Sequence, residues 1–395
     1  MKTYVLECFQ YSEQDTALFL AKELKRVCTE WNVHDKISAV ITDSTDNITS
    51  AIKIIGWKLL PCFAHNLDSI VQNALTEIRN IQNKIKTVIE YFQKSPEAIQ
   101  RLKQVQSQMD LESLTLKQDM INKWCTTYDM FDSVLKVKDA LLSTLTTYYP
   151  HVNFTNDDVT VLKEVCEILK VFKHITEEMI SEKDVMASKI ILFVNALRKI
   201  CSQFVTSDNS PEVVSLVEKL SESINKNFKD VETNNVYTEA TLLDPRFKKY
   251  GFSDKKHFEA AKKSVVAAIV KNIPPPANTP EKERRNNGNS IWDFFDTCVA
   301  EMNNNSNPTT AALAEVDKYL DEPLLPRQSN PLIWWEERKA VYPRLYEYTK
   351  KRLCVVGTSV PSEYLFSKSG QAVIEKRNRL KGQKVSQIIF LNANI

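Results

Sequence analysis

The feature that most narrows the possible folds of this sequence is the helical spacing of apolar residues along most of its long segments. Only 6 of the 395 residues are glycine, which argues against collagen-like chains and against all-β folds rich in turns. Hydrophobic residues make up 43% and charged residues 26%, as in globular proteins with a large core. At roughly 100–200 residues per domain, the sequence predicts a mainly helical protein of two or three domains.

Short β-branched segments near the N-terminus interrupt this helical pattern. Residues 4–9 and Ile37–Thr42 are typical of strands, and they flank an amphipathic helix over residues 17–31. A second helix and a third extended segment end at Cys62. This order predicts a βαβ-like core, followed by one long amphipathic helix over residues 64–92.

The chain lacks the usual signs of a membrane or secreted protein. No segment approaches about 18–20 uninterrupted apolar residues, and Glu7 falls too early for a signal peptide. Eight cysteines are scattered without the regular spacing of a small disulfide-stabilised domain. We therefore expect a soluble protein, made in the cytosol, whose cysteines are thiols.

Positive charge is concentrated near the C-terminus. The formal charge of the chain is +2, yet residues 331–395 contain 12 Lys or Arg against 5 Asp or Glu. Five cations fall within nine residues: Lys376, Arg377, Arg379, Lys381 and Lys384. Such a cluster is suited to phosphate contact, although a solvated helix face is its usual explanation. Upstream, the proline-rich and polar residues 274–290 predict an exposed, disordered loop.

Three motifs occur in a fixed order along the chain, at Ile41–Asn47, Leu60–His65 and Ser362–Ser367. Further matches lie at Lys123-Trp124 and in the C-terminal segment, which contains Trp334-Trp335, the basic cluster and an ending at Phe390–Asn394. Together these residues resemble the hAT transposase family over residues 4–395.

The resemblance implies an α/β plus all-α fold, in which a ribonuclease-H-like core is interrupted by a large helical insertion. Residues 1–65 would form the N-terminal part of the core, residues 66–330 the insertion, and residues 331–395 the dimerisation region that completes the core. The two leading strands of such a core have no counterpart in this chain.

Asp43 and Glu363 match two of the three carboxylates that hold Mg²⁺ or Mn²⁺ in this family. Such ions activate an attacking oxygen and stabilise the leaving oxygen at a phosphodiester, and they prefer carboxylate ligands. The family's first aspartate lies upstream of residue 4, so we expect an incomplete metal site, no cofactor and no transposition by this chain. A zinc finger is also not expected, because no Cys-x-x-Cys with a downstream histidine pair occurs.

The same resemblance predicts DNA contacts at His65, Lys123 and Trp124, in addition to Lys376, Arg377 and Arg379. Trp124 matches a tryptophan that stacks on a displaced base, whereas a core tryptophan is the ordinary alternative. Cys62 and His65 make at most half of a zinc site, so Cys62 is interpreted as packing. His65 is either close to DNA or a satisfied buried histidine.

Homodimerisation and nuclear localisation follow from the resemblance as further expectations, with DNA as a partner and neither a membrane nor a small-molecule substrate involved. The dimerisation region contains large apolar residues that we expect to bury surface between or within subunits: Trp334, Trp335, Tyr342, Val385, Ile388 and Ile389. The predicted function is a non-catalytic, DNA-binding and homodimerising transposase descendant. Two alternatives stay open: a fragment of an active transposase, and an interaction scaffold or transcriptional co-regulator that does not bind DNA directly.

Overall fold

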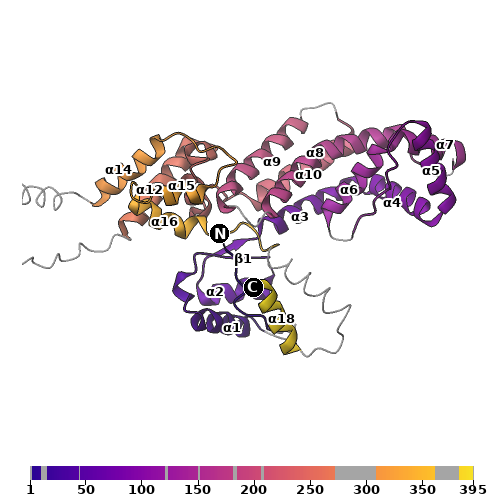
Figure 1. The fold of residues 1–395 in the computed structure, drawn as a ribbon. Coiled ribbons are helices and arrows are strands. Elements are labelled where there is room, and N and C mark those ends of the chain that lie inside the picture. The colour runs from indigo at the N-terminus through magenta and orange to yellow at the C-terminus, as the bar shows by residue number, and fades with distance from the viewer. Residues whose placement is uncertain are drawn as a thin grey trace, which may run out of the picture. The chain divides into compact units, whose positions relative to one another are not determined.

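A computed structural model describes residues 2–9, 16–43, 45–120, 123–149, 152–180, 185–205, 209–271, 308–360 and 382–394. The described chain is mostly helical, which confirms the main expectation from the sequence (Figure 1). It forms two compact units. The larger unit comprises residues 2–183, 193–229 and 357–395, and the smaller unit comprises residues 184–192 and 230–356.

A parallel βαβ element lies at the start of the larger unit. Strands β1 (Val40–Thr42) and β2 (Leu59–Pro61) pair in parallel, and α2 (Asp46–Ile55) is the crossover between them. Parallel strands need such a crossover, because a tight turn cannot join them. Gly56 ends α2 with a φ of 85°, a left-handed conformation that favours glycine. Helix α1 (Ala17–Glu30) packs on α2 through a small apolar cluster that includes Leu20 and Ala51.

The strand predicted at residues 4–9 does not form within the described chain, whose sheet has two strands. The Val5 amide donates to Asn394 Oδ1 at 3.0 Å, and Asn394 Nδ2 donates to the Val5 carbonyl at 2.8 Å. Asn394 is the last residue of α18 (Gly382–Asn394), which lies beside the end of α1, where Trp31 and Phe390 are 6.3 Å apart between ring centroids (Figure 1). A side-chain amide thus occupies the backbone groups that a neighbouring strand would need.

The long helix predicted over residues 64–92 is divided into α3 (Phe63–Ala74), a 3₁₀ segment η2 (Leu75–Ile78) and α4 (Arg79–Lys94). The Thr76 hydroxyl donates to the Asn73 carbonyl at 2.6 Å, and this competes with the regular backbone bonds of the helix. The sequence contains neither glycine nor proline at this position, so the interruption of the helix could not be predicted from the residues that usually break helices. The remaining helices of the larger unit are α5 (Pro96–Gln108), α6 (Trp124–Lys136), α7 (Lys138–Tyr148), α8 (Asn156–Ile180), most of α9 (Ile190–Val205) and α10 (Pro211–Asn227).

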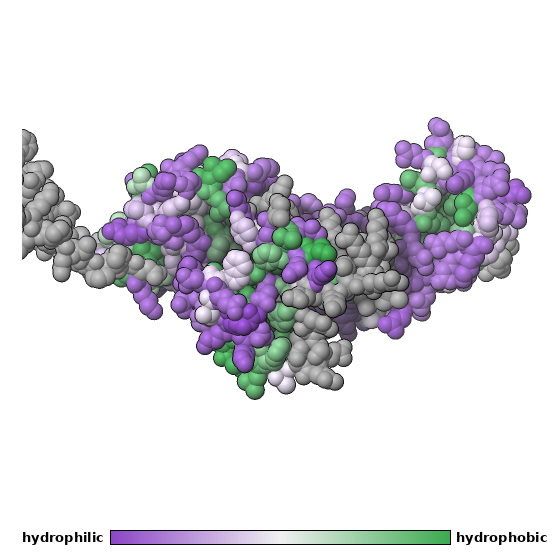
Figure 2. Space-filling view, turned by 60° about the horizontal axis from the view of Figure 1, so that its bottom comes forward, coloured by the Kyte–Doolittle hydropathy of each residue, from purple (hydrophilic) through white to green (hydrophobic). Residues whose placement is uncertain are grey.

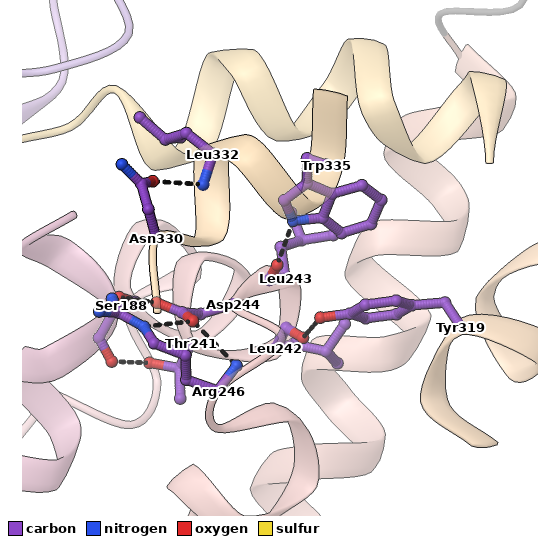
Figure 3. Close-up of polar contacts among 10 residues, drawn as sticks. All are labelled: Ser188, Thr241, Leu242, Leu243, Asp244, Arg246, Tyr319, Asn330, Leu332 and Trp335. Carbon is purple, nitrogen blue, oxygen red and sulfur yellow. Dashed lines mark hydrogen bonds and ion pairs between the residues drawn. The ribbon is translucent and has the colours of Figure 1, made fainter. Parts of the chain in front are cut away.

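Aromatic rings pack at the centre of the smaller unit. Its elements are η3 (Ala187–Lys189), α11 (Asn235–Leu243), η4 (Lys248–Gly251), α12 (Lys255–Lys271), α14 (Pro308–Asp321), α15 (Pro331–Glu337) and α16 (Pro343–Leu353). Trp335 Nε1 donates to the Leu243 carbonyl at 2.9 Å, and the Tyr319 hydroxyl donates to the Leu242 carbonyl at 3.0 Å (Figure 3). The buried rings therefore satisfy carbonyls in the last turn of α11, which lack partners within the helix.

The two units do not coincide with the three regions predicted from the sequence. Region 66–330 contributes most of α3, α4–α8 and α10 to the larger unit, and α11, α12 and α14 to the smaller one. The loop predicted at 274–290 lies outside the described residues. Within the described ranges, no helix is both long and apolar enough to cross a membrane. Hydrophilic residues cover much of the face seen in Figure 2, and hydrophobic residues gather in a few places on it.

Candidate functional site

Asp43 lies directly after β1, at the carboxyl end of the parallel pair. Its carboxylate is half-buried, and Oδ1 accepts hydrogen bonds from the hydroxyls of Thr42 at 3.1 Å and Thr45 at 3.0 Å. Ligands and substrates of open α/β sheets commonly lie at this edge. The sequence prediction placed Asp43 at a strand end, and the structure places it there.

Cys62 lies at the same edge, directly after β2. Its amide donates to the Thr42 carbonyl at 2.9 Å, and its side chain is buried, as the packing interpretation requires. The sulfur accepts the His65 amide at 3.5 Å as the N-cap of α3, and the Ser359 amide at 3.4 Å. Thr358 Oγ1 is 3.4 Å from the same sulfur. Cys62 therefore links the strand ends to a segment almost 300 residues later in the chain.

A backbone bond strengthens this link: the Phe63 amide donates to the Gly357 carbonyl at 3.0 Å. Residues 357–359 are thus held at the strand ends, and Val360 is the last described residue before Glu363. Glu363, Lys376, Arg377 and Arg379 lie outside the described residues. The linking role of Cys62 was not predicted from the sequence, because no local pattern indicates which distant residues will contact a given side chain.

The described residues do not make a metal site at this edge. Across those ranges, no group of three His, Cys, Asp or Glu side chains could hold an ion. Asp43 Oδ1 accepts hydrogen bonds from two hydroxyls, and the neighbouring Cys62 sulfur accepts hydrogen bonds from backbone amides. Glu363, the second carboxylate of the predicted site, lies outside the described residues, so the incomplete metal site stays a prediction.

His65 and Lys123 are both exposed, on helices α3 and α6, which contact each other. On α3, the Asp68 carboxylate accepts a hydrogen bond from the amide of Trp124, the first residue of α6 after its N-cap Lys123. Burial raises the pKa of Asp68, and the Trp124 amide and the nearby His65 partly oppose this shift. The Trp124 side chain is 1% exposed, so in this structure it is a core residue. Its stacking on a DNA base stays a prediction and requires the ring to leave the core.

The aromatic residues predicted for dimerisation pack within the chain. Trp334, Trp335 and Tyr342 are all buried in the smaller unit, where the Trp334 and Tyr342 rings stack 6.2 Å apart. On α18, Ile389 is buried and Val385 and Ile388 are half-buried. Four apolar side chains nearby are at least 41% exposed and were not predicted from the sequence: Leu313, Leu324, Ile333 and Val341.

Two family models match the chain. Residues 60–168 match the ZBED1 RNase-like helical domain, and residues 315–395 match the hAT family C-terminal dimerisation region. The chain is 25% identical to the human zinc finger BED domain-containing protein 4 over 85% of its own length and 29% of that protein. It is also 23% identical to the maize putative AC transposase, over 96% of the chain and 51% of the relative.

These matches confirm the resemblance to the hAT transposase family that the sequence motifs indicated. A further similar protein is the rice zinc finger BED domain-containing protein RICESLEEPER 1, which is 25% identical over 87% of the chain and 53% of the relative. The chain thus spans between about a third and just over half the length of these curated relatives. The match at 315–395 begins within α14 and includes α15, α16 and α18.

Proposed function

We propose that this chain is a hAT-transposase-derived protein that binds DNA and forms a homodimer through its C-terminal region. In this proposal, β1, α2 and β2 belong to a ribonuclease-H-like core, and α3–α10 belong to the inserted helical region. The observation that carries the proposal is the attachment of residues 357–359 to the strand ends beside Asp43. It joins the C-terminal region to the sheet edge where this family carries its chemistry.

Exposed apolar side chains in the matched C-terminal region support self-association. Ile333 is 57% exposed and Val341 is 46% exposed, next to the buried Trp334 and Tyr342. Burying such residues against a partner removes apolar surface from water, which is the main favourable term in association. We therefore assign the dimer contact to Ile333 and Val341 rather than to the buried aromatic rings.

Light scattering coupled to size-exclusion chromatography tests the dimer. Wild type is expected at twice the chain mass of 45.4 kDa, and an Ile333→Asp/Val341→Asp variant at that single-chain mass. Leu313→Asp is the matched control, since Leu313 is 41% exposed but precedes the matched region at 315–395. A wild-type protein that is monomeric at micromolar concentration rejects this part of the proposal.

DNA binding is tested by fluorescence anisotropy with labelled duplexes over a range of salt concentrations. For a protein that neutralises Z phosphates, the logarithm of the binding constant falls with the logarithm of the salt concentration with a slope of about −0.9Z. A slope near zero, or no binding at low salt, would instead favour the scaffold alternative.

The position of the Asp43 carboxylate at a strand end favours a second candidate function, in which the chain is part of an active transposase. Metal-dependent nicking of DNA by wild type in Mn²⁺, lost in Asp43→Asn, would identify the chain as part of an active transposase. Absence of nicking together with salt-dependent binding supports the non-catalytic proposal.

A further inference from the structure

The turn between α11 and α12, residues 244–254, is fixed by buried groups at its start. Asp244 is fully buried, and its carboxylate accepts bonds from the Arg246 amide at 3.0 Å, from Arg246 Nε at 2.9 Å and from Nη2 at 2.8 Å (Figure 3). Ser188 Oγ donates to the same carboxylate at 2.7 Å. The first half of the turn is therefore braced by its own Arg246 and anchored to the segment that contains Ser188.

Lys248 holds the next part of the turn in an uncommon conformation. Its φ is 47°, in the left-handed region, and its side chain is 1% exposed. Nζ donates to the carbonyls of Tyr319 at 2.6 Å and Glu322 at 2.7 Å, at the end of α14. Three residues later, a Cβ on Gly251 would lie 2.3 Å from Thr241 Cγ2, so this position has no room for a side chain.

Lys249 and Tyr250, which lie between these two fixed points, project into solvent. Lys249 is exposed, Tyr250 is 68% exposed, and Lys249 Nζ lies 5.3 Å from the centroid of the Tyr250 ring. The backbone of the turn is thus tightly constrained, whereas its two outermost side chains contribute little to the core. A rigid support with an exposed ring and a cation is an arrangement typical of a binding surface.

Lys255 and Lys256 add two exposed cations at the start of α12. Cations are disfavoured at a helix N-terminus, and the first turn of α12 contains no acidic residue. Neither lysine forms an ion pair with another described residue. The Phe252 and Phe258 rings, 6.0 Å apart, keep the turn close to the helix. Asp254, directly before the helix, caps it by accepting the His257 amide at 2.8 Å, so the two lysine side chains are not used for capping and are exposed to an anionic partner.

We propose that Lys249, Tyr250, Lys255 and Lys256, here called the tyrosine tip, bind one strand of DNA. The three ammonium groups contact phosphates, and the Tyr250 ring stacks on an unpaired base. Charge complementarity favours a polyanion, and the exposed ring favours one that carries flat bases. This inference rests on the proposed DNA binding, and it names residues other than His65, Lys123 and the basic cluster at 376–384.

The test compares the binding of two labelled probes, a duplex and the same duplex with a single-stranded extension. Tyr250→Ala is expected to weaken binding of the extended probe by about 5- to 150-fold, the range for loss of one stacked base, and to leave the plain duplex almost unchanged. Tyr250→Phe keeps the ring and should bind as wild type. Replacing all three lysines by alanine should make the salt slope on the extended probe shallower by about 2, at about 0.7 per phosphate of a single strand.

Tyr148→Ala is the matched control. Tyr148 is 45% exposed and has the Arg101 guanidinium 5.0 Å from its ring centroid, so it is an exposed tyrosine beside a cation outside the tyrosine tip. Wild type that binds neither probe refutes the proposed DNA binding itself. If Tyr250→Ala and the triple-lysine variant each bind the extended probe as tightly as wild type does, the proposed DNA binding stands and the tyrosine tip is rejected. Equal losses in Tyr250→Ala and Tyr148→Ala also reject it.

Discussion

Replacing Asp244 by alanine should lower the free energy of unfolding of the smaller unit by about 3–5 kcal/mol, the usual result of breaking a buried ion pair. Its carboxylate is fully buried and accepts four hydrogen bonds from Arg246 and Ser188. The Arg246 side chain is 2% exposed, so its charge cannot regain water when its partner is removed. Urea unfolding followed by circular dichroism measures the loss, and hydrogen exchange of peptides from α11 locates it.

A second substitution separates the lost ion pair from local damage. In Asp244→Ala/Arg246→Met both charges of the pair are removed, so the double variant should recover at least about 2 kcal/mol relative to Asp244→Ala. The control is Glu347→Ala, which breaks an exposed pair with Lys350 and should change stability by less than about 0.5 kcal/mol. The reasoning is refuted if Asp244→Ala costs less than about 1 kcal/mol, or if the double variant is no more stable than the single one.

Three further predictions concern single positions. Gly251→Ala should lower the melting temperature, because its Cβ would lie 2.3 Å from Thr241 Cγ2 and such overpacking costs about 1–3 kcal/mol; an unchanged melting temperature contradicts the close approach. Burial lowers the pKa of Lys248 from 10.5 to about 8, so between these pH values the unfolded chain binds more protons than the folded chain. The free energy of unfolding of wild type, relative to that of Lys248→Met, should therefore rise from pH 8 to 10.5 by up to about 3 kcal/mol. In urea titrations, Trp124→Ala should be less stable by about 3–5 kcal/mol, and a loss below about 1 kcal/mol would mean that the indole is not a core residue.

Local patterns predicted much of this structure. Apolar periodicity identified the helical character, and the β-branched run before Asp43 identified a strand with the carboxylate at its end. The scattered cysteines are free thiols within the described ranges, and burial raises the pKa of Cys166 and Cys201 to about 12. The helices and the strand depend on interactions between residues a few positions apart, and the spacing of residues in the sequence predicts such interactions directly.

Features that depend on distant partners were not predictable in the same way. No strand forms at residues 4–9, where the Val5 backbone bonds instead to the side chain of Asn394, 389 residues further along the chain. Likewise, Trp334 and Ile333 are adjacent and both apolar, yet Trp334 is buried and Ile333 is 57% exposed. Composition cannot distinguish a ring that packs inside its own chain from one that packs against a partner, because both remove apolar surface from water.

The contacts that close the larger unit also bear on the order in which the protein acquires its structure during translation. Its helices α4–α7 contact one another within a short stretch of sequence, and such local contacts form early. The Phe63–Gly357 and Val5–Asn394 bonds cannot form until residues 357 and 394, respectively, have left the ribosome. Until then, Val5 and Trp31 lack their contacts with α18. A nascent chain of this protein should therefore pass through a long interval in which the helical region is folded and the sheet edge is still open, and in which chaperones have access to that edge.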